Sequence, residues 1–351
     1  MGNERRFSAI NTKLRVMRSR FLKDEDYIAL MKKESVTEQV KYLISNTVYG
    51  KVLEDVEEYE DIQAVELELE KFHTLQFEKI LKYFSDDYEK YLKSFLLRHE
   101  VEDLKIYIRA LARGESLEKY SNTSVTRKKY YSFSYDQIKN AKTLDELIDK
   151  LKGTRYYDVI YPYRHEDYGK LMFYMEMNLD RLYFDTIHDS AQEMSKADRD
   201  AFEDAFGENI DILNIEWIYR GLKFYNLLPE ELINYTLPYG KHLDFKDLKE
   251  LCYMDIEEFK KNISKTKYKE MVNEDKDIDL FMGVRVQRHM YNYFKSKFGQ
   301  GKLDISIPNA YLHLLEYEIK DIISILEALK YGLSYYEAKE YLVRDIEGSD
   351  Y

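Results

Sequence analysis

Apolar residues recur at helical spacing along almost the whole chain. Near its start, steps of three and four residues keep a set of apolar side chains on one face of a helix. These residues are Phe7, Ile10, Leu14, Met17 and Phe21. A long amphipathic helix opens at Ile62 and continues past Ile80. The nearest strand candidate, residues 156–163, is interrupted by Pro162. The pattern therefore predicts an all-α protein.

Several predicted helices begin with a capping box. In this motif a Ser, Thr or Asp side chain accepts a hydrogen bond from the amide three residues on, and a Glu or Gln reaches back. The candidate pairs are Ser35/Glu38, Ser134/Gln137, Thr143/Glu146, Asp255/Glu258 and Ser334/Glu337. These pairs place helix starts independently of the apolar spacing.

The most informative feature is an internal repeat of about 110 residues. One helix recurs at residues 100–111, 211–222 and 318–329, and its apolar stripe superposes without gaps. An acid opens each copy and an Asp or Asn follows three residues later. These positions are Glu100, Asp103, Asp211, Asn214, Glu318 and Asp321. We expect them to have a structural role in each copy.

A second element recurs in the same order, at residues 35–49, 143–156 and 255–268. Each copy begins with a cap and ends in Thr-x-Tyr. Two independent elements in one order predict three similar helical domains. The predicted divisions are N-terminal helices at 1–34, three repeats at 35–142, 143–254 and 255–333, and a C-terminal helix at 334–351.

A small residue precedes the last Leu of each repeated helix: Ala110, Gly221 and Ala328. Glycine inside a helix costs about 1 kcal/mol relative to alanine. Gly221 therefore either allows close packing by another segment or is merely tolerated.

Composition supports the helical assignment. The 351 residues include only 13 Gly and 4 Pro, too few for turn-rich β folds. The net charge of −12 argues against nucleic acid as a general partner. The lone Cys252 excludes an internal disulfide framework. No stretch is long and apolar enough to predict a membrane span, and no leader pattern follows Met1.

Candidate chemistry is sparse, and we predict no catalytic, cofactor-binding or metal-binding residue. The segment Gly299–Lys302 lacks the phosphate-loop pattern, so no nucleotide is expected to bind this chain. Glu70 and His73 have the Glu-x-x-His spacing of di-iron bundles, but a second complete motif is missing. Nucleophile signatures are also missing.

An all-helical prenyl-diphosphate enzyme is the alternative enzymatic hypothesis. Such enzymes hold Mg²⁺ with clustered acids, and Asp86, Asp87 and Glu89 form the best cluster in this chain. The cluster lacks the later Asp of a DDxxD motif, and acids at a helix N-terminus explain it equally well. A generic helical adaptor is the third hypothesis.

Two charged segments are candidate partner contacts. Arg15, Arg18 and Arg20 fall outside the apolar stripe of the first helix and are expected either to meet an acidic partner or anionic headgroups, or to be solvated. The acidic run Glu54–Glu70 contains nine carboxylates and no basic residue. We interpret this run as a solvated face.

The ensemble resembles the C-type subunit of bacterial and archaeal V-type (A/V-type) ATP synthases, which is similar to the d-type subunit of eukaryotic vacuolar ATPases. The features that carry the resemblance are the basic helix at residues 7–22, the segments 98–109, 214–220 and 237–240, and the three-repeat layout. The third copy departs from the pattern, because Glu327 stands where Arg109 and Arg220 stand. A uniform role for this position is therefore not expected.

The resemblance implies a funnel of three similar helical domains around a pseudo-three-fold axis. It also implies a non-catalytic rotor component that seats on the membrane proteolipid ring and receives the central shaft, built of D-type and F-type subunits. Such a protein would be peripheral, at the cytoplasmic face of the membrane. It would couple ATP turnover to H⁺ or Na⁺ transport without a cofactor of its own.

Overall fold

A computed structural model describes residues 3–120, 130–165, 168–225 and 227–346. Within these ranges the secondary structure is helical and no strand occurs, which confirms the all-α prediction. The strand candidate at residues 156–163 forms α10 (Tyr157–Ile160) and a 3₁₀ turn (Tyr161–Tyr163). Proline is well suited to the first turn of a helix, where its missing amide proton is not needed.

The chain divides into two compact units that interleave along the sequence. The first unit comprises Met1–Phe84, Asp200–Ile212 and Glu257–Tyr351; the second comprises Ser85–Arg199 and Leu213–Ile256. The long helix α12 (Lys196–Arg220) passes through these divisions. The three predicted repeats follow different boundaries, and those boundaries stay a prediction.

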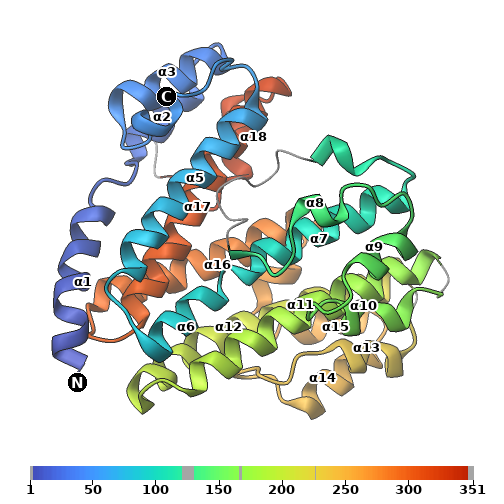
Figure 1. The fold of residues 1–351 in the computed structure, drawn as a ribbon. Coiled ribbons are helices and arrows are strands. Elements are labelled where there is room, and N and C mark those ends of the chain that lie inside the picture. Colours follow the sequence, from blue (N-terminus) through green and yellow to red (C-terminus); the bar gives the residue numbers. More distant parts are fainter. Residues whose placement is uncertain (1–2, 121–129, 166–167, 226, 347–351) are drawn as a thin grey trace. The chain divides into compact units, whose positions relative to one another are not determined.

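The first unit is built around α17, most of whose residues are buried. Its elements are α1 (Asn3–Arg18), α2 (Asp24–Met31), α3 (Val36–Asn46), α4 (Gly50–Leu53), α5 (Ile62–Leu81), α15 (Ile256–Ile263), η5 (Lys269–Val272), α16 (Ile278–Gln300), α17 (Ser306–Lys330) and α18 (Tyr335–Glu340). Helix α17 packs against α16, α5 and α1, and Figure 1 shows α5 and α17 side by side. This helix carries the third copy of the repeated sequence.

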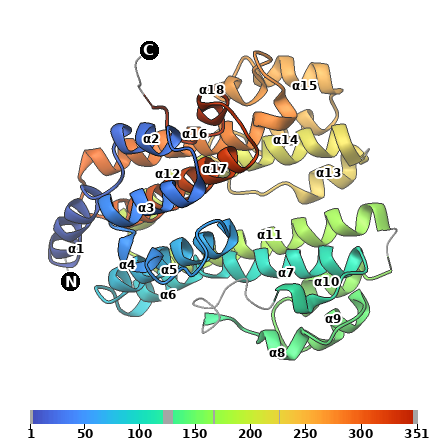
Figure 2. The same ribbon diagram turned by 90° about the horizontal axis from the view of Figure 1, so that it is seen from above.

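The second unit is organised by α11, which packs against α6, α7 and α10. Its elements are α6 (Asp86–Ser94), α7 (Leu97–Ala112), η1 (Leu117–Tyr120), α8 (Tyr135–Ile138), α9 (Leu144–Lys150), α10, α11 (Tyr168–Gln192), η4 (Gly221–Tyr225), α13 (Pro229–Tyr235) and α14 (Phe245–Cys252). Figure 2 shows α7 and α11 running side by side. Helix α7 carries the first copy of the repeated sequence.

The predicted apolar stripes face the core. In α1, Phe7, Ile10 and Leu14 are fully buried. The helix ends at Arg18, earlier than the stripe suggests, yet Phe21 is still buried in the following turn. Four predicted caps also form, since Ser35, Ser134, Thr143 and Ser334 each accept a hydrogen bond from the amide three residues on.

Gly221 sits where another segment packs closely. Helix α12 ends at Arg220, and Gly221 opens the π-helical turn η4. A Cβ added at Gly221 would overlap the Leu232 side chain of α13. Of the two interpretations of this glycine, the structure therefore supports close packing.

Candidate partner-binding site

The three candidate arginines lie in different local settings. Arg15 is exposed on α1 and its guanidinium lies against Gly301, which ends α16 in the left-handed conformation. The Arg18 guanidinium lies over the Phe21 ring, 4.2 Å from the ring centroid. Arg20 is exposed in the turn after α1. Contact of these arginines with a partner stays a prediction.

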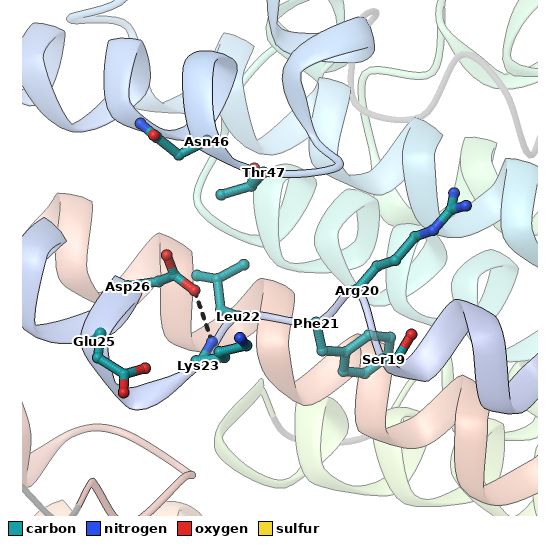
Figure 3. Close-up of a pocket in the computed structure, with 9 residues that line it drawn as sticks. All are labelled: Ser19, Arg20, Phe21, Leu22, Lys23, Glu25, Asp26, Asn46 and Thr47. Atoms are coloured by element: carbon teal, nitrogen blue, oxygen red, sulfur yellow. Dashed lines mark hydrogen bonds between the residues drawn. The ribbon is translucent and has the colours of Figure 1, made fainter.

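The turn between α1 and α2 borders a surface cavity of about 400 Å³. Its lining residues are Ser19, Arg20, Phe21, Leu22, Lys23, Glu25, Asp26, Asn46 and Thr47. Figure 3 shows Glu25 and Asp26 on one side of the cavity and Arg20 on the other. The Lys23 amide donates to Asp26 Oδ2 at 2.8 Å, which fixes the entry into α2. The cavity is lined by both signs of charge, and its lining residues include neither a histidine nor a cysteine.

Beneath this turn lies the buried carboxylate of Glu318 on α17. It accepts hydrogen bonds from the Leu22 amide at 2.9 Å and from the Tyr49 hydroxyl at 2.7 Å. Burial raises the pKa of Glu318 to about 8. The Tyr49 hydrogen bond, the Arg18 charge and the Leu22 amide oppose that rise in pKa. Glu318 therefore ties the N-terminal segment to the last long helix.

The equivalent acids in the other two copies also lie beside a tyrosine. The Tyr268 hydroxyl donates to Asp211 Oδ2 at 2.7 Å. Tyr156 is fully buried, and its pKa is raised by burial and by the neighbouring Glu100. Glu100 also accepts from the Phe133 amide at 3.3 Å. Each acid that opens a repeated helix thus lies near the tyrosine of a Thr-x-Tyr segment. Glu318 and Asp211 accept a hydrogen bond from that tyrosine, whereas the Tyr156 hydroxyl has no hydrogen-bond partner among the described residues.

The three Thr-x-Tyr segments share one backbone turn. In each, the threonine hydroxyl accepts from the tyrosine amide two residues on, at 3.1–3.3 Å, and donates to a carbonyl three or four residues back. The threonines are Thr47, Thr154 and Thr266. The shared turn explains why both residues of the motif recur.

The polar residue three positions after each acid forms hydrogen bonds with a segment that follows the repeated helix. Asn214 accepts from the Leu237 amide at 2.8 Å and donates to the Leu237 carbonyl at 3.0 Å. Asp321 accepts from the Val343 amide at 2.6 Å, and burial raises its pKa to about 7. Asp103 accepts from the Tyr131 hydroxyl at 2.8 Å. All six acid and amide positions predicted to define the repeat are buried and hydrogen-bonded.

The arginine position of the repeat behaves differently. Arg109 Nε contacts Glu176 Oε1 of α11 at 2.7 Å, whereas Arg220 reaches Glu216 of its own helix at 3.8 Å. Glu327 is exposed. The contacts at this position therefore differ among the three copies.

The candidate metal residues are not assembled. His73 Nε2 lies 3.4 Å from the Leu312 carbonyl oxygen, and Asp86 and Asp87 open α6. Among the residues that the structure describes, no group of three or more His, Cys, Asp or Glu side chains is placed to hold a metal ion. None of the described helices is both long enough and apolar enough to cross a bilayer.

The repeat in the sequence singled out these acids but did not predict what they bind. The backbone amides of Leu22, Phe133, Leu237 and Val343 carry no side-chain signal. The available signal was the acid at the start of a buried stripe, since a carboxylate at such a position must find hydrogen-bond donors.

Comparison with known proteins assigns the chain to one family. Residues 10–341 match the family described as ATP synthase (C/AC39) subunit. The corresponding C-type subunit of the A-type ATP synthase of Methanosarcina mazei is 20% identical over 283 residues, which are 81% of this chain and 76% of the relative. Its counterpart in Methanocaldococcus jannaschii is 26% identical over 271 residues, 76% and 67% of the two chains. Because the family match spans nearly the whole sequence, the chain belongs to the ATP synthase (C/AC39) subunit family.

Proposed function

We propose that this chain is a non-catalytic component of an A/V-type ATP synthase that links the central shaft to the membrane proteolipid ring. The observation that carries the proposal is the family match over residues 10–341. In this role the chain is peripheral at the cytoplasmic face of the membrane and binds D-type and F-type shaft subunits. It couples ATP turnover to H⁺ or Na⁺ transport by transmitting torque.

The internal equivalences support a socket of three similar repeats. Three similar Thr-x-Tyr turns each place a tyrosine near the acid that opens a repeated helix. Repeats arranged around a pseudo-three-fold axis would give the shaft a roughly round seat. Long helices such as α11, α12 and α17 supply the stiffness that torque transmission needs.

The buried acids also favour a structural role over a catalytic one. The carboxylate oxygens of Glu318 and Asp321 accept hydrogen bonds from backbone amides and a tyrosine of this chain. Carboxylates committed in this way are not free to bind Mg²⁺, so these two acids do not supply the metal site that a prenyl-diphosphate enzyme would need.

The direct test is reconstitution from purified parts. The chain is mixed with the D-type and F-type shaft subunits and with detergent-solubilised proteolipid ring at micromolar concentration. We expect a ternary complex on size-exclusion chromatography. Failure to bind either component would refute the socket, and a pull-down from native membranes dominated by other proteins would favour the generic adaptor.

A further inference from the structure

Basic side chains from three helices of the first compact unit lie close to one another, because α4 packs against α5 and Lys13 of α1 contacts Tyr83 at the end of α5. Helices α1, α4 and α5 and the turns after α1 and α5 contribute them, and we call this surface the Lys79 patch. Its members are Lys13, Arg20, Lys51, Lys79 and Lys82. The group stands out because the whole chain carries a net charge of −12.

The contacts between α1 and the end of α5 hold the patch together. Lys13 Nζ lies 3.3 Å from the Tyr83 hydroxyl and 4.8 Å from the centroid of the Tyr83 ring. The pKa of Lys79 is lowered, first by burial and then by the positive charges of the other four members. The cations are therefore close enough to repel one another.

Within the described part of the chain these cations lack a carboxylate at contact distance. None of the five cations forms an ion pair there, and Lys79 Nζ donates instead to the neutral Gln76 Oε1 at 3.3 Å. Arg20 extends away from the carboxylates of Glu25 and Asp26 (Figure 3). The patch is a concentration of positive charge without counterions from the described residues.

Exposed apolar side chains alternate with these cations. Leu75, Lys79 and Tyr83 are spaced four residues apart along α5 and the turn that continues it, and so lie along one face. Leu75 is 42% exposed and Tyr83 is 40% exposed. On α1, Val16 is 53% exposed and lies three residues from Lys13. The surface therefore offers both cations and apolar contact area.

We infer that the Lys79 patch is a docking surface for an acidic amphipathic helix of a partner protein. The carboxylates of such a helix would neutralise the five cations, and its apolar stripe would cover Leu75, Tyr83 and Val16. Opposite charges brought together in this way speed association and select the partner. The inference depends on the proposed function in one respect only: the natural partner is sought in the ATP synthase complex.

The surroundings of the patch disfavour an anionic bilayer as the occupant. The segment Glu54–Glu70 carries nine carboxylates and leads into the patch along α5. A bilayer is a plane much larger than the patch, and an anionic one would repel the rest of the chain, which outweighs the patch and gives the protein a net charge of −12. A short acidic helix covers the patch alone.

The test compares two triple variants of the whole chain. The patch variant is K51Q/K79Q/K82Q, and the matched control is K261Q/K265Q/K269Q. The control lysines are exposed in the same compact unit, and none forms an ion pair with a described residue. Far-UV circular dichroism and thermal unfolding verify that both variants fold as the wild type does.

The first probe is a fluorescent synthetic helix with a Glu-rich polar face and a Leu stripe, titrated by anisotropy. At low salt, about 50 mM, the patch variant should bind at least about tenfold more weakly than wild type, and the difference should shrink at about 200 mM. The control variant should match wild type, and a peptide with Gln for Glu should not bind. Equal affinity of patch variant and wild type would overturn the inference.

The second probe is a set of vesicles of phosphatidylcholine with or without phosphatidylglycerol. Wild type should not float with either. Flotation with the anionic vesicles that the patch variant loses would overturn the protein partner in favour of a lipid surface.

The natural setting is tested with ATP synthase membranes stripped of this protein. Rebinding of the patch variant should be about tenfold weaker than that of wild type and of the control. Equal rebinding of all three would count against the inference. Failure of wild type itself to rebind would count against the proposed function and would leave the peptide result standing.

Discussion

Replacing Glu318 with Gln should remove a large part of the pH dependence of stability. Glu318 is buried on α17, where it accepts from the Leu22 amide and the Tyr49 hydroxyl. The groups that face it also include Tyr27, Arg18 and Arg344. Glutamine has nearly the same size and stays uncharged at every pH.

The size of this pH-dependent change in the free energy of unfolding follows from the pKa of Glu318. Burial raises the pKa of Glu318 from 4.5 to about 8 on folding. Between these two pH values the folded state binds the proton of Glu318 more tightly than the unfolded state does. The stabilisation from this proton is therefore fully present below about pH 4.5 and is lost as the pH rises through about 8. At about 1.36 kcal/mol per pH unit, the loss from this one group is at most about 5 kcal/mol.

Urea unfolding of wild type and Glu318→Gln at about pH 5 and pH 8, followed by circular dichroism, measures this loss. The variant should lose several kcal/mol less than wild type over the interval. One glutamine nitrogen replaces an accepting oxygen, which adds a destabilisation of about 1–3 kcal/mol at both pH values and cancels in the comparison.

The matched control is Glu327→Gln, an exposed position on the same helix, which should leave the pH dependence unchanged. If wild type and Glu318→Gln lose the same free energy of unfolding between the two pH values, then Glu318 does not titrate with a raised pKa. The reasoning from burial would then be wrong.

Three further outcomes are expected. Gly221→Ala should destabilise the chain by about 1–3 kcal/mol because its Cβ meets a packed leucine, whereas Gly283→Ala, with open space around it, should be neutral or stabilise by up to about 1 kcal/mol; thermal unfolding of both tests the contrast. Asn214→Ala should cost about 2–5 kcal/mol, since two buried backbone groups lose their partner, and an unchanged urea midpoint would contradict this. Burial raises the pKa of Cys252 to about 12, so a thiol reagent should label it much more slowly in the native state than in urea.

The sequence predicted which side chains of a helix are buried better than it predicted which other helices pack against them. The stripe of α1 and the caps of α3 and α9 follow from local spacing and local hydrogen bonds, and the structure confirms them. Gly221 was ambiguous because the packing that decides it comes from α13, a helix that local spacing does not relate to α12.

Long-range partners explain what sequence reasoning could not supply. The Leu22 amide donates a hydrogen bond to Glu318, 296 positions away in the chain. Every residue except proline has such an amide, so the residue type at position 22 does not reveal this bond. Arg18 was grouped with Arg15 and Arg20 by charge and spacing alone. Its stacking on Phe21 depends on the turn after α1, which the apolar pattern had extended as helix. The Lys79 patch was missed because its members come from separate elements.

The hydrogen bond between Tyr49 and Glu318 cannot form until late in the translation of the chain. The two residues are 269 positions apart. At about 5–20 residues per second, a ribosome delivers Glu318 roughly 15–50 s after Tyr49. Throughout that interval the first helices lack their buried acid, and the tyrosine hydroxyl and the Leu22 amide must be hydrated or shielded by a chaperone. The segment made first is therefore among the last to reach its native contacts, and a chain that terminates before residue 318 leaves it without them.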